Sequence, residues 1–231
     1  MIFDKRVKEF INKIVMAPSN PMKVKYYHYR VEFQKRGAGH IHGVLWLDLD
    51  ELENTFPGLK SAMKKLKSQD GLNMKEKSAV AAFVDSCSTC DLKDEDLADT
   101  VDKVQRHRHK GNVEKNTGCY KRGKTWRSNF PRLPSEKTKI AQPLKQGEMS
   151  ARKFDAQKKE YKEILQKVKD KLVELTEDWK KECSLETDDL LEKAGVNKEK
   201  YYEALEVSQN AAFIIMKRDP KEAYINNYNP E

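Results

Sequence analysis

The spacing of apolar residues along the chain predicts alternating helical and extended segments. Residues 4–14 carry apolar side chains every three or four positions, which predicts a short amphipathic helix. Residues 24–34 and 40–47 are rich in Tyr, Val and Leu, and the glycine-containing turn between them predicts an antiparallel hairpin. Further helices are expected at residues 59–67, 75–86, 94–106, 150–182, 185–194 and 198–208, with an apolar strand at 211–217.

The segment 150–182 has the strongest helical pattern in the chain. One stripe of its surface is apolar, whereas its other positions are rich in Lys and Glu. The stripe consists of Tyr161, Ile164, Val168, Leu172, Leu175 and Trp179. Such a stripe either packs against the rest of the protein or pairs with a second helix in a coiled coil, and the pattern favours packing.

The composition argues against membrane-spanning, secreted and disulfide-rich proteins. The chain has 231 residues, of which 35% are charged and 38% hydrophobic. No run of 18 apolar residues occurs, and the first ten residues lack the apolar core of a secretory signal. Four cysteines are too few for a disulfide framework. We therefore expect a non-membrane protein of one or two domains whose thiols are reduced or bound to a metal.

The net charge of +8 is concentrated in one segment. Residues 103–145 contain thirteen Lys or Arg and two acids, with aromatic residues between the cations. This combination favours single-stranded nucleic acid as a partner, since phosphates attract the cations and bases stack on aromatic rings. A solvated basic loop is the alternative. The candidate DNA-binding residues are Lys121, Arg122, Lys124, Trp126, Arg127 and Arg132, with Tyr120 and Phe130 as further stacking candidates.

His40 and His42 flank Ile41 in the second predicted strand. Because side chains alternate along a strand, the two imidazoles share one face and form half of a metal site. Glu32 and Gln34 share a face of the preceding strand and are expected opposite the histidines. A carboxylate and two imidazoles with open coordination positions suit Mg²⁺ or Mn²⁺ acting on a phosphate. Two packed strand histidines are the alternative interpretation.

A second cluster of potential metal ligands follows a CxxC sequence. Cys₃His coordination of a structural zinc ion would use Cys87, Cys90 and Cys119 with either His107 or His109. A zinc ion would help to order a loop that contains few apolar residues. Two unligated cysteines and a pair of phosphate-contacting histidines are the alternative.

Four stretches of the sequence resemble one family. The string Glu32-Phe-Gln-Lys-Arg-Gly-Ala-Gly-His-Ile-His42 resembles the HUH endonucleases, and more specifically the replication-initiator domain of Helitron transposases. The segment Asn129-Phe-Pro-Arg132 resembles the Phe-Pro-Arg segment of that domain. Lys217-Arg-Asp-Pro220 and Ile225-Asn-Asn-Tyr-Asn-Pro230 resemble its later segments. The resemblance spans residues 2–230.

The resemblance implies an α+β fold, in which an antiparallel, ferredoxin-like sheet carries large helical and zinc-loop insertions. It implies metal-dependent nicking of single-stranded DNA by a tyrosine, with His40, His42 and Glu32 as metal ligands and Gln34 as the alternative third ligand. It also suggests a nuclear location. The expected segments are a metal-motif hairpin at 1–48, a helical insertion at 49–106, a basic Cys/His region at 107–149, helices at 150–195 and a return to the core at 196–231.

The nucleophile is the point at which the sequence departs from the family. Helitron-type domains place their catalytic tyrosines after the Asn-Tyr-Asn-Pro segment, so we expect the chain to be an internal piece of such a domain. Tyr201 and Tyr202 are the internal candidates, with core packing as the alternative role. Two other functions stay open: an inactive, zinc-stabilised DNA-binding module, and an interaction protein built on the helix at 150–182.

Overall fold

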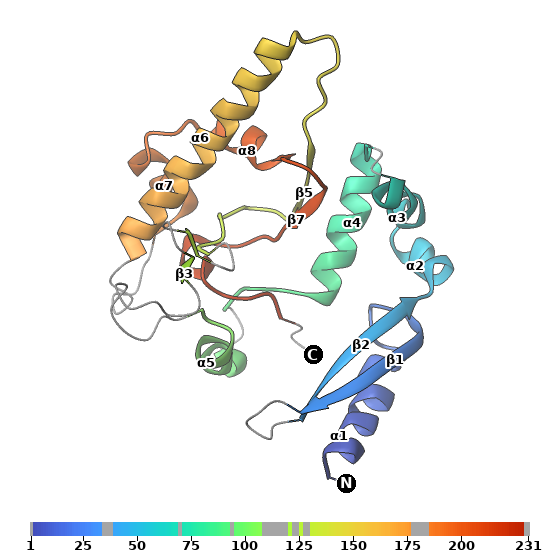
Figure 1. Ribbon diagram of the computed structural model, residues 1–231. Helices are drawn as coiled ribbons and strands as arrows, with labels where there is room; N and C mark the ends of the chain where they lie inside the picture. The colour runs from blue at the N-terminus through green and yellow to red at the C-terminus, as the bar shows by residue number, and fades with distance from the viewer. Residues whose placement is uncertain are drawn as a thin grey trace. The chain divides into compact units, whose positions relative to one another are not determined.

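The computed structural model describes residues 2–33, 39–68, 71–92, 95–107, 120–121, 125–126, 130–176 and 185–228. The chain forms two compact units, Met1–Cys87 (unit 1) and Ser88–Glu231 (unit 2). Helices and small sheets are present in both, so the α+β class is confirmed (Figure 1). The unit boundary falls inside the segment that was expected to be one helical insertion. No helix of the described ranges is long and apolar enough to cross a membrane.

Unit 1 is organised around a hairpin of two long antiparallel strands, β1 (Val24–Phe33) and β2 (Gly39–Leu47). The strands agree with the sequence prediction to within a residue, and the turn at 34–38 lies outside the described residues. The register places Val31 opposite Ile41 and Glu32 opposite His40. The odd-numbered residues near this end of β1 therefore share a face with Ile41, and the even-numbered residues share the other face with the two histidines.

One face of the hairpin is covered by the N-terminal helix. Helix α1 (Ile2–Phe10) continues directly into a π-helical turn, η1 (Ile11–Val15). The buried residues of this helix pack against side chains of the hairpin: the cluster contains Val7, Ile11 and Val15 together with Phe3, Met16, Val24, Tyr29 and Ile41. The histidine face points away from this cluster. Packing on one side thus fixes the hairpin while the other side stays accessible.

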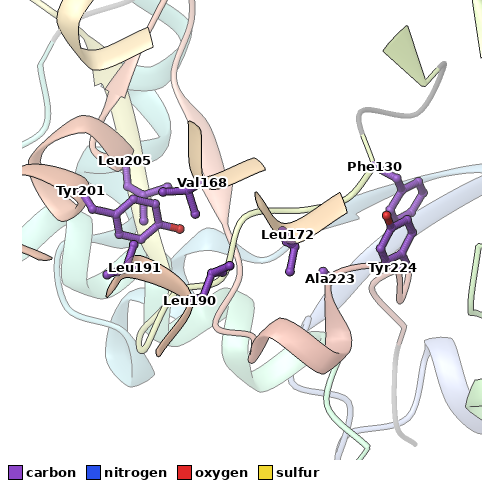
Figure 2. Packing of buried hydrophobic residues seen from close by; sticks show 9 residues of the cluster. All are labelled: Phe130, Val168, Leu172, Leu190, Leu191, Tyr201, Leu205, Ala223 and Tyr224. Atoms are coloured by element: carbon purple, nitrogen blue, oxygen red, sulfur yellow. The ribbon is translucent and has the colours of Figure 1, made fainter. Parts of the chain in front are cut away.

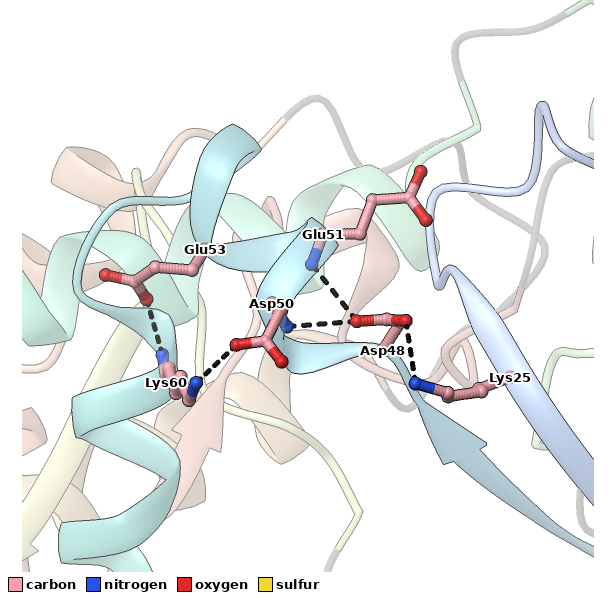
Figure 3. A network of polar contacts seen from close by, with 6 residues as sticks. All are labelled: Lys25, Asp48, Asp50, Glu51, Glu53 and Lys60. Atoms are coloured by element: carbon pink, nitrogen blue, oxygen red, sulfur yellow. Dashed lines mark hydrogen bonds and ion pairs between the residues drawn. The ribbon is translucent and has the colours of Figure 1, made fainter.

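A capped turn joins the hairpin to the helices of unit 1. Asp48 precedes helix α2 (Leu49–Thr55), and its carboxylate accepts hydrogen bonds from the N–H groups of Asp50 and Glu51 (Figure 3). This is an N-cap, which satisfies two N–H groups that lack partners within the helix. Glu53 accepts in turn from the N–H groups of Gly58 and Lys60 at the start of α3 (Leu59–Ser68). Gly58 has a φ of +105°, a conformation that favours glycine.

A buried carboxylate joins α3 to α4 (Met74–Cys87). Glu76 is 4% exposed and accepts hydrogen bonds from Ser61 Oγ, Lys65 Nζ and the N–H of Asn73. Asn73 Oδ1 accepts from the N–H of Glu76 in return, which closes a reciprocal cap at the start of α4. The hydrogen bonds from Lys65, Ser61 and Asn73 lower the pKa of Glu76 from 4.5 to about 2.

Unit 2 is built around a long helix, α6 (Ala151–Thr176), with α7 (Thr187–Lys193) and α8 (Lys198–Leu205) against it. Figure 2 shows the core that they share: Phe130, Val168, Leu172, Leu190, Leu191, Tyr201, Leu205, Ala223 and Tyr224. Val168 and Leu172 of the predicted stripe are fully buried there. The stripe therefore packs within the unit, as the pattern favoured, and Trp179 lies outside the described residues.

The largest sheet of unit 2 among the described residues has the strand order β6-β5-β7. Strand β5 (Lys139–Pro143) pairs parallel with β6 (Val207–Ser208) and antiparallel with β7 (Phe213–Ile215). The strand predicted at 211–217 is thus present but shorter, and it pairs with β5. Strands β3 (Tyr120–Lys121) and β4 (Thr125–Trp126) form a small ribbon, and α5 (Glu95–Val104) lies within the helix predicted at 94–106.

A buried arginine joins distant segments of unit 2. Arg218 is 4% exposed, and its guanidinium donates hydrogen bonds to the carbonyls of Glu222 and Ile225 and to Asn227 Oδ1, at 2.8–3.0 Å. Its backbone exchanges two hydrogen bonds with Ser135. The 3₁₀ turn η2 (Pro220–Glu222) lies between these partners. The Arg-x-Pro segment noted in the sequence is therefore a structural element.

Replacing Arg218 by Met is expected to destabilise unit 2 by at least about 3 kcal/mol, because two buried carbonyls would lose a charged donor. Arg218→Lys should recover only part of this loss, since an ammonium cannot reach three acceptors placed around a planar fork. Lys221→Met, at an exposed neighbour, is the control. Urea unfolding, with hydrogen exchange to assign the transition to unit 2, measures the difference. Equal midpoints for Arg218→Met and the control would contradict the role of the guanidinium.

The Glu76 carboxyl makes the stability of unit 1 depend on pH. A carboxyl with a lowered pKa stabilises the folded state above its ordinary value of 4.5, and this contribution is lost as the pH falls towards about 2. Glu76→Gln should therefore be less stable at pH 7 and lose less stability than the wild type on acidification. Thermal unfolding at several pH values, with Glu9→Gln as an exposed control, measures this. Parallel pH profiles for wild type and Glu76→Gln would refute it.

Candidate metal centre

The uncovered face of the hairpin gathers a carboxylate and two imidazoles. Glu32 of β1 lies directly opposite His40 of β2, and Arg30 lies opposite His42. Residues two apart on a strand point the same way, so the four side chains share one face. The strand pairing thus brings Glu32 to both histidines without any contribution from loop residues. The predicted common face is confirmed for Glu32, His40 and His42, whereas Gln34 lies outside the described residues.

The three side chains lie within direct contact of one another. Glu32 Oε2 is 3.1 Å from His42 Nε2 and 3.6 Å from His40 Nε2. The two Nε2 atoms are 3.1 Å apart, and the rings meet edge to face with centroids 4.9 Å apart. One possible ligand atom from each residue therefore points toward a common centre.

These distances match the spacing of ligands around one metal ion. Nitrogen and oxygen ligands lie about 2.1 Å from a small divalent cation, so neighbouring ligands are about 3.0 Å apart in an octahedron and about 3.4 Å apart in a tetrahedron. The separations of 3.1, 3.1 and 3.6 Å fall close to this range. Hydrogen bonds between the same side chains also occur at such distances. The geometry therefore fits a cation as well as it fits a polar cluster.

The chemistry of the donors and their exposure narrow the choice of metal. Two imidazoles and one carboxylate suit Mn²⁺ better than Mg²⁺, which prefers oxygen ligands. The side chains of His40, Glu32 and His42 are 35%, 39% and 57% exposed, so solvent or substrate can reach the centre. Three protein ligands leave coordination positions open, as in metal sites that act on a substrate.

Arg30 is a member of the site that sequence reasoning missed. Its guanidinium forms an ion pair with Oε1 of Glu32, whereas both histidines contact Oε2. The arginine balances the charge of Glu32 and restrains its orientation, as a partner beyond the ligands commonly does. The signal was present in the sequence, since Arg30 precedes Glu32 by two positions on the same strand.

The predicted zinc ligands that the structure describes have separate surroundings. Cys90 is buried, and its Sγ donates a hydrogen bond to the carbonyl of Lys217. Burial raises the pKa of this thiol to about 11, which opposes the thiolate form that zinc requires. The His107 ring stacks on Phe130, with centroids 4.5 Å apart. Within the described ranges, Cys87, Cys90 and His107 do not form a metal-sized group. His109 and Cys119 lie outside those ranges.

The two candidate nucleophiles occupy packed positions in unit 2. Tyr201 is fully buried, and its hydroxyl donates to the carbonyl of Pro134 at 2.7 Å. Burial raises the pKa of Tyr201 well above its usual value, and it raises that of Tyr202 to about 12. A phenolate, the form that attacks phosphorus, is therefore disfavoured at both residues. The geometry agrees with the core-packing alternative for Tyr201.

The candidate DNA-binding residues are only partly described. Arg132 is exposed, and its guanidinium carbon lies 5.1 Å from the centroid of the Phe130 ring. Phe130 itself is 1% exposed, so the interpretation of this ring as a stacking surface for bases was wrong. The backbones of Tyr120, Lys121 and Trp126 are described without their side chains, and Arg122, Lys124 and Arg127 lie outside the described residues.

Comparisons of the chain with protein-family models, with curated proteins and with solved structures found no match. The hairpin centre is therefore interpreted from its own geometry and from the sequence motifs.

Proposed function

We propose that the hairpin of unit 1 is the metal half of an HUH-type nicking site for single-stranded DNA, of the kind found in Helitron-like transposases. One observation carries the proposal: Glu32, His40 and His42 bring three ligand atoms within 4.8 Å of one another on an open sheet face. The motif that these residues form in the sequence is the one on which the family resemblance depends. Neither a buried polar cluster nor a closed structural site needs this degree of exposure.

The residues of the face divide into ligands and supporting groups. Glu32, His40 and His42 would hold a divalent cation, which would supply positive charge to a phosphate oxygen of the DNA. Arg30 holds the carboxylate in place and adds a second positive charge beside the phosphate. The site is built on two paired strands rather than on loops, which keeps the ligands in a fixed arrangement before substrate arrives.

The same face continues into an aromatic surface further along the strands. Tyr26 lies opposite Trp46, and the two side chains are 63% and 51% exposed. Val44, between Trp46 and the histidines, is 57% exposed. Unpaired bases can stack on exposed aromatic rings, whereas the bases of a duplex are not available for such contacts. The surface therefore supports a single-stranded substrate whose backbone crosses the metal centre.

The nicking reaction needs a tyrosine that the described site does not contain. In this reaction the tyrosine hydroxyl loses its proton and its oxygen forms a bond to phosphorus, while the bond from phosphorus to the 3′ oxygen breaks and that oxygen takes up a proton. The hydroxyl of Tyr201 donates a hydrogen bond to the buried carbonyl of Pro134. By resemblance, the reacting tyrosine follows the Asn-Tyr-Asn-Pro segment. We therefore propose that unit 1 supplies the metal and phosphate site and that Tyr201 and Tyr202 do not supply the nucleophile.

Metal binding is the first property to measure. The wild-type chain is expected to bind one Mn²⁺ at the hairpin, and His42→Ala should weaken this binding more than about tenfold because one of three ligands is lost. His28→Ala is the matched control, since His28 lies on the same strand face but outside the cluster. Calorimetric titration with Mn²⁺ gives the affinities. Equal affinities for wild type and His42→Ala would refute the metal centre.

Comparing DNA binding with and without metal tests whether single-stranded DNA is the substrate of the hairpin site. Single-stranded DNA is expected to bind the wild type more tightly in Mn²⁺ than in EDTA, and His40→Ala should abolish this difference while binding in EDTA is unchanged. Intact mass spectrometry after incubation with DNA and Mn²⁺ detects covalent attachment. A nucleotide adduct mapped to Tyr201 or Tyr202 would contradict the packing role of that pair. An affinity that is insensitive to Mn²⁺ would exclude the proposed substrate site.

A further inference from the structure

Unit 2 contains a groove that no motif in the sequence indicated. It has a volume of about 1130 Å³ and lies between α6, the segment at 131–133 and the stretch from 205 to 216. Six cationic side chains line it: Arg132, Lys158, Lys159, Lys162, Lys169 and Arg218. No acidic residue is present among the described lining residues. The groove is therefore a concave surface with an excess of positive charge.

The cations differ in how far they are committed to other contacts. The guanidinium of Arg218 donates hydrogen bonds to two carbonyls and to Asn227. It therefore contributes positive charge to the groove rather than hydrogen bonds to a ligand. Lys159 lies 3.9 Å from Glu163 in an exposed pair, which is weak in water. Desolvation lowers the pKa of Lys169, with smaller effects from the charge of Arg132, which lowers it, and of Asp170, which raises it. Both cations line the groove, and such a concentration of positive charge favours an anionic ligand.

The floor of the groove is apolar at its sheet end. Phe213 and Ile214 of β7 line it, and they are 50% and 44% exposed. Strand β7 lies at the edge of the described sheet, and both side chains border the groove. Gln209 and Asn210 add amide groups to the rim. A simple inorganic anion would use the cations and leave the apolar floor empty, so the floor indicates a ligand with both anionic and flat apolar parts.

We propose that this groove binds single-stranded nucleic acid, with phosphates along the lysines of α6 and a base on Phe213. Phosphates repeat at short intervals along a single strand, and each unpaired base presents a flat face that suits an aromatic ring. Lys158 and Lys162 are four residues apart, so they lie on one face of the helix and present two charges side by side. Binding here needs no metal, so it is independent of the nicking site proposed for unit 1.

The test uses the full chain in EDTA, which removes any contribution from the hairpin centre. Fluorescence anisotropy with labelled 20-nucleotide oligothymidylate and oligouridylate gives the affinity for each nucleic acid. Lys158→Glu/Lys162→Glu is expected to weaken binding more than about tenfold and to reduce the salt slope by roughly 1.4, since each lost phosphate contact on a single strand is worth about 0.7. Phe213→Ala should weaken binding roughly fivefold or more through loss of stacking.

The matched control is Lys153→Glu/Lys167→Glu, which makes the same charge change on exposed lysines of α6 outside the groove. This control should leave the affinity within about twofold of the wild type. Circular dichroism confirms that each variant is folded. Equal losses in the two double variants would mean general charge attraction and would overturn the groove. Competition by polyglutamate as strong as by oligothymidylate, with no effect of Phe213→Ala, would point to an acidic protein and would overturn it too.

Discussion

Unit 2 depends on the buried guanidinium of Arg218. A charged group loses much of its hydration when it is buried, and Arg218 recovers this loss through three hydrogen bonds to the segment that follows it. This segment pairs with other parts of the unit: Arg132 N–H donates to Ala223, and His107 N–H donates to Tyr224. Ala223 and Tyr224 of the same segment belong to the core around Phe130, so the turn held by Arg218 positions part of that core.

The two proposed sites rest on different kinds of constraint. The metal centre is local, because the register of one hairpin sets every contact among Glu32, His40 and His42. The groove of unit 2 is not local, because it combines residues from α6 with residues near 132 and 213. The helix is fixed by an adjoining side, where Val168 and Leu172 enter the core, and Leu165 lies at the border between that core and the groove. Burial of one face of α6 thereby directs its lysines into the groove.

The sequence predicted the features that follow from a repeating pattern of residues. It did not predict those that depend on contacts between residues far apart in the chain. Strand alternation was enough to place Glu32 with the histidines, and helical spacing was enough to identify Leu172 as a core residue. Helix α2 was missed because its seven residues are stabilised by the Asp48 cap rather than by an apolar stripe. Strand β5 was missed because its partners lie more than 60 residues away. Phe130 was misassigned because a basic neighbourhood in sequence said nothing about its burial.

The pairing of the first and last described segments of unit 2 has a consequence for synthesis of the chain. Thr89 exchanges backbone hydrogen bonds with Tyr228, whose hydroxyl also donates to the Asp91 carbonyl, 137 residues away in sequence. Unit 1 is complete once its own residues have left the ribosome, whereas unit 2 cannot close before Tyr228 emerges. At about 5–20 residues per second, its first segment waits roughly 7–27 s for a partner. We therefore expect a stage of synthesis in which the hairpin of unit 1 is folded while unit 2 still lacks the segment around Tyr228.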